Sequence, residues 1–73
     1  MATIEVRVEV TGLVWEVVAR PGDRVAAGDP LMILESMKME IPVVTEREGT
    51  IKEILVTEGM PVSEGQVVAL MER

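Results

Sequence analysis

Few side chains in this 73-residue sequence could form covalent bonds. It contains no Cys and no His, which excludes thiolate chemistry, the usual zinc ligands and every Ser-His or Cys-His arrangement. Ser36 and Ser63 have no base to activate them, and no carboxylate pair is clustered. Amine chemistry remains, because Lys38 and Lys52 are the two lysines. We therefore expect no metal site and no catalytic residue, and an acceptor of modification is favoured over a small enzyme.

Lys38 stands in an unusual turn. Met37 and Lys38 occupy the centre of a predicted hairpin that has no glycine within eight residues on either side. Tight two-residue turns normally use Asn-Gly or Asp-Gly, because their central residues need positive φ. Met37 and Met39 would also place apolar side chains in water beside the lysine. Strain and apolar exposure at a tip both suggest a function.

Other readings of these residues are less specific. A lysine in a turn is usually only solvated, and methionines often belong to a core. Full burial of both methionines is not expected, because residues two apart on a strand face the same way beside the turn. We expect Lys52 to be an ordinary surface residue within a strand, and Trp15 to be a partly buried packing residue.

The sequence contains an internal repeat. Shifting it by 37 residues aligns residues 2–36 with residues 39–73 without a gap. Nine aligned pairs are identical: Ile4/Ile41, Val6/Val43, Glu9/Glu46, Gly12/Gly49, Glu16/Glu53, Gly22/Gly59, Val25/Val62, Gly28/Gly65 and Glu35/Glu72. We interpret residues 1–73 as one domain built from two copies. The junction near Lys38 should then lie opposite the two termini.

Strand signals dominate both copies. Valine is abundant, apolar and polar residues alternate over residues 4–10, and glycine and proline mark turns. We expect eight short strands near residues 3–9, 13–19, 24–26, 31–35, 39–45, 50–56, 61–63 and 67–72. Two four-stranded units can bury each other's apolar faces. The predicted fold is all-β: a flattened eight-stranded β-barrel, or barrel-sandwich hybrid, of two four-stranded sheets with pseudo-two-fold symmetry.

Charge limits the partners that we expect. The formal net charge is −6, and no basic patch or aromatic platform is available for nucleic acid. The same charge disfavours anionic membrane surfaces, and no apolar run is long enough to span a membrane. We expect no nucleic-acid or membrane partner, a monomer and a cytoplasmic location.

The run from Glu35 to Glu40, Glu-Ser-Met-Lys-Met-Glu, resembles the attachment site of the biotinyl/lipoyl domain family. Over residues 4–71 the chain is similar to free-standing biotin/lipoyl attachment proteins of the biotin carboxyl carrier type. The resemblance implies that Lys38 accepts covalent biotin and that Met37 and Met39 are flanking recognition residues. It also implies three partners: biotin protein ligase, which attaches the cofactor, and the biotin carboxylase and carboxyltransferase components between which carboxybiotin travels.

Two departures and two alternatives accompany this resemblance. The family more often has Ala at the position of Ser36, and the first copy has no room for the protruding thumb loop of some bacterial carriers. A lipoyl carrier of the 2-oxo acid dehydrogenase type shares the fold, but its tip usually reads Asp-Lys-Ala. Lipoate, or acceptance of both cofactors, is therefore the first alternative. An unmodified structural or assembly domain is the second.

Overall fold

A computed structural model describes residues 2–73, which form eight strands and no helix. The strands are β1 (Thr3–Arg7), β2 (Gly12–Val17), β3 (Arg24–Val25), β4 (Pro30–Ser36), β5 (Met39–Val44), β6 (Gly49–Ile54), β7 (Pro61–Val62) and β8 (Val67–Glu72). All eight expected strands are confirmed, and each begins within one residue of its expected start. Strands β1, β2 and β6 end two residues before their expected ends, and the other strands end within one residue of theirs.

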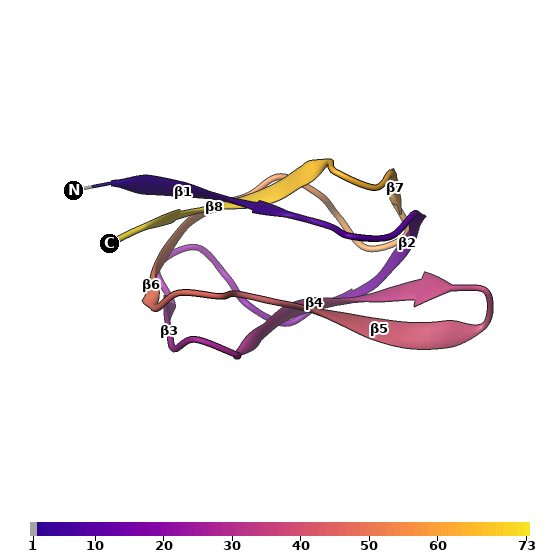
Figure 1. Ribbon diagram of the computed structural model, residues 1–73, viewed down its shortest axis with the longest axis horizontal. Helices are drawn as coiled ribbons and strands as arrows, with labels where there is room; N and C mark the ends of the chain where they lie inside the picture. The colour runs from indigo at the N-terminus through magenta and orange to yellow at the C-terminus, as the bar shows by residue number, and fades with distance from the viewer. Residues whose placement is uncertain (1) are drawn as a thin grey trace.

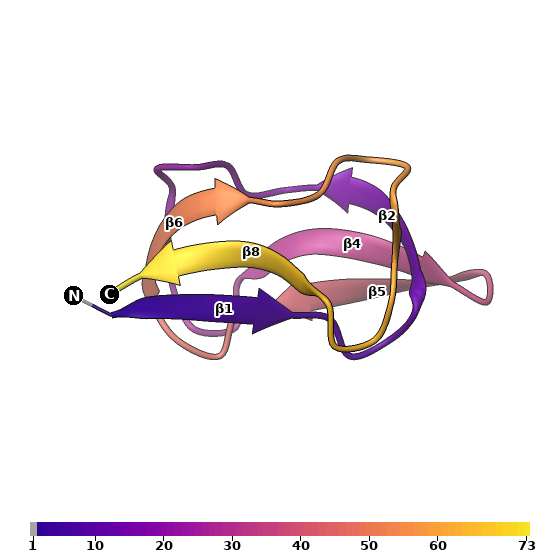
Figure 2. The ribbon, with the colours of Figure 1, turned by 90° about the horizontal axis from the view of Figure 1, so that it is seen from above.

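The strands form two antiparallel sheets of four strands each (Figures 1 and 2). One sheet has the order β1-β8-β6-β3 and the other has the order β5-β4-β2-β7. The two sheets are equivalent under the repeat. Each strand in the order β1-β8-β6-β3 aligns, in the repeat, with the strand at the same place in the order β5-β4-β2-β7. The expected all-β fold of two four-stranded sheets is confirmed.

An aliphatic core lies between the two sheets. Its largest fully buried side chains are Leu31, Met32, Leu34, Ile51, Met71, Val14 and Val68. The pairing of strands explains this choice, since residues directly opposite each other on neighbouring strands point to the same side of a sheet. Val14 is opposite Leu34 and both face inward, whereas the next pair, Leu13 and Glu35, faces outward.

Each half of the repeat completes the other through its turns. In the first turn, the amide of Gly22 donates to the carbonyl of Ile51 at 2.8 Å. In the matching turn, the amide of Gly59 donates to the carbonyl of Val14 at 2.7 Å. Both glycines have φ near +90°, a conformation that other residues rarely adopt. The two halves therefore interlock instead of packing as separate units.

The chain termini and the β4–β5 hairpin lie at opposite ends of the molecule (Figure 1). The molecule is elongated along this direction, with principal extents of 36, 18 and 17 Å. Because residues 2–73 contain no helix, they contain none that is long and apolar enough to cross a membrane. The expected placement of the junction opposite the termini is confirmed, and the junction is free of neighbouring strands at its end.

Substitution of two leucines on paired strands tests how much the core contributes to the free energy of unfolding. Leu34 in β4 is completely buried, whereas Leu13 in β2 is 46% exposed. We expect Leu34→Ala to lower the free energy of unfolding by about 2–5 kcal/mol, through lost burial and the cavity left behind. Leu13→Ala should lower it by less than about 1 kcal/mol. Equilibrium denaturation in urea measures both, and equal losses would contradict this assignment of the core.

Candidate functional site

The β4–β5 hairpin ends in a two-residue turn made by Met37 and Lys38. Ser36 pairs with Met39 as the last pair of the ladder, so nothing but the two turn residues lies beyond it. The torsion φ is 52° for Met37 and 66° for Lys38. Two consecutive positive values are typical of a type I′ turn, whose twist matches that of the flanking strands. The turn expected from the sequence is present, and residues other than glycine occupy both left-handed positions.

The side chains at this tip are open to solvent. Met37 is 91% exposed, Met39 is 60% exposed, and the side chain of Lys38 is exposed as well. In the part of the chain that the structure describes, Lys38 forms no ion pair. Its amine is therefore free to enter the active site of another protein. The expectation that the two methionines are not both buried is confirmed.

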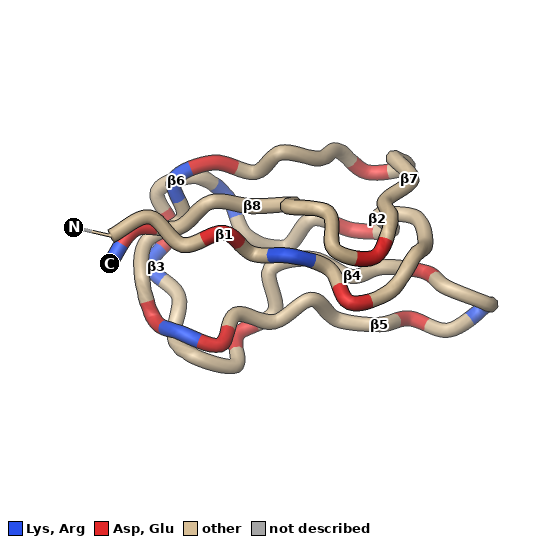
Figure 3. The backbone as a smooth tube through the Cα atoms, turned by 45° about the horizontal axis from the view of Figure 1, so that its top comes forward, with Lys and Arg blue, Asp and Glu red and all other residues tan. Residues whose placement is uncertain are grey.

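The base of the tip carries negative charge on one face. Glu35 in β4 is directly opposite Glu40 in β5, and both side chains are exposed. Like charges in this arrangement repel each other and weaken the hairpin slightly. Elsewhere the acidic residues are spread over the surface of the barrel, as Figure 3 shows. The two carboxylates beside the lysine thus lower the stability of the hairpin and make one of its faces negatively charged.

The tip is a projection and not a pocket. A hollow of about 380 Å³ lies between β1 and β5, with Ile4, Val10 and Val44 among its lining residues. None of residues 35–40 lines this hollow. Figure 2 shows the hairpin extending beyond the body of the molecule. A convex, solvated lysine is suited to being the substrate of other enzymes.

Two other residues considered in the sequence lie away from this turn. Lys52 is an exposed residue of β6 in the opposite sheet, as expected for a surface lysine. Trp15 is 51% exposed, which is more open than the packing role expected for it. The reason is a β-bulge, since the pairing of β2 with β4 shifts between Val14 and Glu16 and leaves Trp15 as the additional residue.

Sequence reasoning missed the contacts that support the tip from below. Gly12 lies so close to β4 that a Cβ atom built on it would be 2.5 Å from the carbonyl oxygen of Glu35. The hydroxyl of Ser36 donates to the carbonyl of Thr11 at 2.9 Å. The identity of Gly12 and Gly49 in the repeat signalled the close approach, because only glycine fits there. Nothing in the sequence signalled the partner of Ser36.

Fold and tip together define a small all-β domain that holds an exposed lysine on a type I′ turn. The family model described as "Biotin-requiring enzyme" matches residues 3–71, and the chain belongs to this biotin/lipoyl family. The resemblance stated from the sequence is confirmed.

Named relatives span nearly the same length as this chain. A biotin/lipoyl attachment protein of Bacillus subtilis is 44% identical over 63 residues, which cover 86% of each chain. A biotinylated protein TB7.3 homolog of Mycobacterium leprae is 40% identical over 67 residues, covering 92% of this chain and 94% of the relative. Among solved structures, urea carboxylase of Kluyveromyces lactis matches with a TM-score of 0.93 and 36% identity. That match covers 99% of this chain and 6% of the carboxylase.

The turn conformation can be tested by substitution at Met37. We expect Met37→Gly to leave the free energy of unfolding unchanged or to raise it by up to about 1 kcal/mol, because glycine adopts positive φ without steric penalty. Met37→Val should lower it by about 1 kcal/mol or more, because a β-branched residue is strained in that region. Thermal and urea denaturation provide the comparison, and equal stability of the two variants would argue against the left-handed turn.

Proposed function

We propose that this chain is a biotin carrier domain, in which Lys38 is the residue that receives the cofactor. The observation that carries the proposal is the position of Lys38 at the solvated end of a strained two-residue turn. Met37 and Met39 are the apolar side chains exposed beside it, and we assign them to recognition by the partner enzymes. The long axis of the molecule separates this tip from the termini.

The domain acts as a carrier and not as a catalyst. The sequence has no His and no Cys, and therefore lacks the most common general base and the thiolate nucleophile. Membership of the biotin/lipoyl family supports the same role, because relatives are named as attachment and biotinylated proteins. Partner enzymes supply the catalysis, and the domain supplies presentation.

Attachment is an acyl transfer to the Nζ atom of Lys38. The lone pair of Nζ attacks the carboxyl carbon of the acyl-adenylate held by biotin protein ligase, a C–N amide bond forms, and the bond from that carbon to the phosphate oxygen breaks so that AMP departs. The nitrogen gives up its protons to a base of the ligase, one before the attack and one as the amide forms. The hairpin contributes position: it holds Nζ away from the barrel, where the ligase can surround it.

When bound, biotin carries the carboxyl group from a biotin carboxylase to a carboxyltransferase. The residues of this chain serve that transfer by tethering, since a flexible lysine stem on a rigid barrel raises the effective concentration of its cargo at both active sites. Relatives support carboxylase partners: pyruvate carboxylase of Bacillus subtilis is 42% identical over 62 residues, covering 85% of this chain and 5% of the enzyme. We infer a monomeric carrier in the cytoplasm without nucleic-acid or membrane partners, in keeping with the net charge of −6.

Biotin is favoured over lipoate by the residues beside the lysine. Met37 and Met39 form the Met-Lys-Met tripeptide, whereas a lipoyl tip usually reads Asp-Lys-Ala. The mycobacterial relatives are named as biotinylated proteins, and a relative from Bacillus subtilis is named for both cofactors. Lipoate is therefore kept as an outcome of the first test.

The two lysines allow a direct test of the attachment site. The wild type, Lys38→Ala and Lys52→Ala are incubated with biotin protein ligase, ATP and biotin, and their intact masses are measured. We expect one biotin increment on the wild type and on Lys52→Ala, and none on Lys38→Ala. Lys52→Ala is the matched control, because Lys52 is also exposed but lies in the middle of β6.

Three results would oppose the proposal. A biotin increment on Lys38→Ala would place the site elsewhere. No increment on any chain would favour an unmodified structural domain. A parallel reaction with lipoate ligase should give less product, and an increment found only there would identify a lipoyl carrier.

Moving the lysine by one position tests whether the ligase recognises the folded hairpin. We expect two double variants, Met37→Lys/Lys38→Met and Lys38→Met/Met39→Lys, to be biotinylated at least about tenfold more slowly than the wild type, a loss of about 1.4 kcal/mol in transition-state stabilisation. The reason is that a shift of one residue turns the lysine toward a different face of the hairpin. Streptavidin blots over a time course measure the rates, and wild-type rates in either variant would refute recognition by register.

A further inference from the structure

Two hydroxyl groups connect the base of the tip to the rest of the barrel. Ser36, the last residue of β4, donates from its hydroxyl to the carbonyl of Thr11 at 2.9 Å. The hydroxyl of Thr11 in turn accepts a hydrogen bond from the amide of Glu64 at 3.1 Å. Glu64 belongs to the turn between β7 and β8, and β8 lies in the other sheet. The hairpin is thus tied through Thr11 to a turn that joins the two sheets.

Close packing of the backbone makes the first of these bonds possible. Gly12 follows Thr11, and a Cβ atom on Gly12 would lie 3.3 Å from the Cβ of Ser36 as well as 2.5 Å from the oxygen of Glu35. The missing side chain allows β2 to press against the end of β4. This approach brings the carbonyl of Thr11 within reach of the hydroxyl of Ser36.

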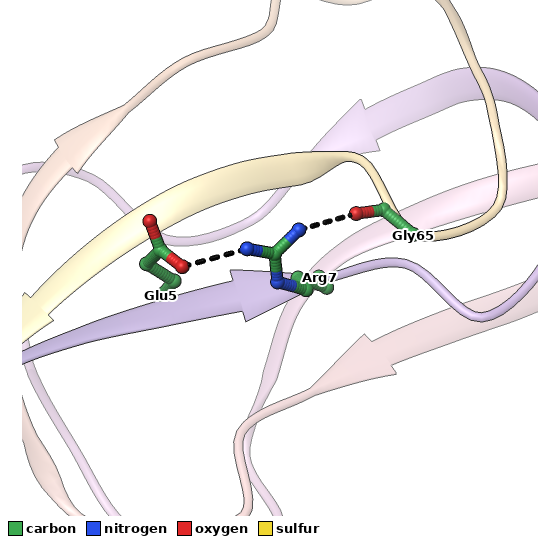
Figure 4. A network of polar contacts seen from close by, with 3 residues as sticks. All are labelled: Glu5, Arg7 and Gly65. Carbon is green, nitrogen blue, oxygen red and sulfur yellow. Dashed lines mark hydrogen bonds and ion pairs between the residues drawn. The ribbon is translucent and has the colours of Figure 1, made fainter.

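The same turn is fixed from the far side by an arginine (Figure 4). The Nη1 atom of Arg7 donates to the carbonyl of Gly65 at 2.8 Å, and its Nη2 atom pairs with Glu5 at 2.8 Å. The amide of Gly65 donates to the carbonyl of Val8, also at 2.8 Å. Hydrogen bonds therefore run from β1, through the β7–β8 turn and Thr11, to the base of the hairpin.

The repeat shows which of these contacts belong to the fold and which are particular to the lysine end. The backbone bond of Gly65 recurs in the other half, where the amide of Gly28 donates to the carbonyl of Thr45 at 2.7 Å. The side-chain bonds do not recur within residues 2–73. The positions equivalent to Arg7, Thr11, Ser36 and Glu64 hold Val44, Glu48, Arg73 and Ala27.

We propose that Ser36 and Thr11 are positioning residues, which hold the hairpin so that Lys38 is presented in one orientation. This inference rests on the proposed function of Lys38. The turn places two residues in the left-handed region, which is unfavourable for both, so the strand ends need support for a single conformation to persist. A tip that is ordered before docking avoids the loss of entropy on binding the ligase, which lowers KM for the carrier.

The test compares Ser36→Ala with two other variants. Ser36→Thr keeps a hydroxyl, and Ser63→Ala removes an exposed hydroxyl for which the structure records no hydrogen bond. The fold should accept Ser36→Ala, because the change removes one hydroxyl from a half-buried side chain and adds no atom to the packing. We expect Ser36→Ala to raise KM for the apo-carrier in the ligase reaction by roughly two- to tenfold with kcat unchanged, as for the loss of one hydrogen bond. Ser36→Thr and Ser63→Ala should stay within about twofold of the wild type.

A readout independent of modification separates this inference from the proposed function. In ¹⁵N relaxation measurements we expect the order parameters of Met37 and Lys38 to fall from about 0.85 toward 0.6 in Ser36→Ala, with those of β6 unchanged. Unchanged order parameters would overturn the positioning role, whether or not the wild type is biotinylated. An unchanged KM in Ser36→Ala would overturn its consequence for ligation. Failure of the wild type to accept biotin at Lys38 would overturn the proposed function itself.

Discussion

Burial of aliphatic side chains between the two sheets is the interaction on which the rest of this structure depends. The chain has no cysteine and therefore no disulfide, and a domain of 73 residues has little margin between burial and conformational entropy. An isolated four-stranded sheet would leave its apolar face in water. The turns increase this dependence, because Gly22 bonds to Ile51 and Gly59 bonds to Val14 across the two halves. Neither half can complete its core or its backbone hydrogen bonds without the other.

This closed barrel explains how a strained turn can persist at its end. A non-glycine residue in the left-handed region is disfavoured by roughly 1–2 kcal/mol, and Met37 and Lys38 both occupy it. The hairpin below them is long for so small a domain, since β4 and β5 pair from Pro30 with Val44 to Ser36 with Met39. Pairing over this length, together with burial of Leu34, sets the register of the two strands, and the register leaves two residues to close the chain. The strain is thus imposed by the barrel on the tip.

Much of this arrangement could be predicted from the sequence, and the failures have physical reasons. The repeat and the glycine pattern predicted eight strands and two sheets, because a gapless duplication requires both copies to fold alike. The exposed turn at Lys38 followed from the position of the junction. The exposure of Trp15 was not predicted, since bulges depend on pairing that local sequence does not encode. The bond from Ser36 to Thr11 was not predicted either, because it joins residues 25 apart through tertiary packing.

The internal repeat allows the hairpin tip to be compared with the opposite end of the molecule. Duplication produces two equivalent ends, and the covalent chain distinguishes them: one end is closed by a hairpin, and the other holds the termini (Figure 1). The two ends share a close glycine approach: a Cβ atom built on Gly12 would lie 2.5 Å from the carbonyl oxygen of Glu35, and one built on Gly49 would lie 2.7 Å from that of Glu72. Features that both ends share are explained by folding alone. Features found at one end only, namely the strained turn and the hydroxyls of Ser36 and Thr11, are not required by the shared architecture. Residues that differ between the two copies are therefore the ones to examine for function, because folding alone does not require the difference.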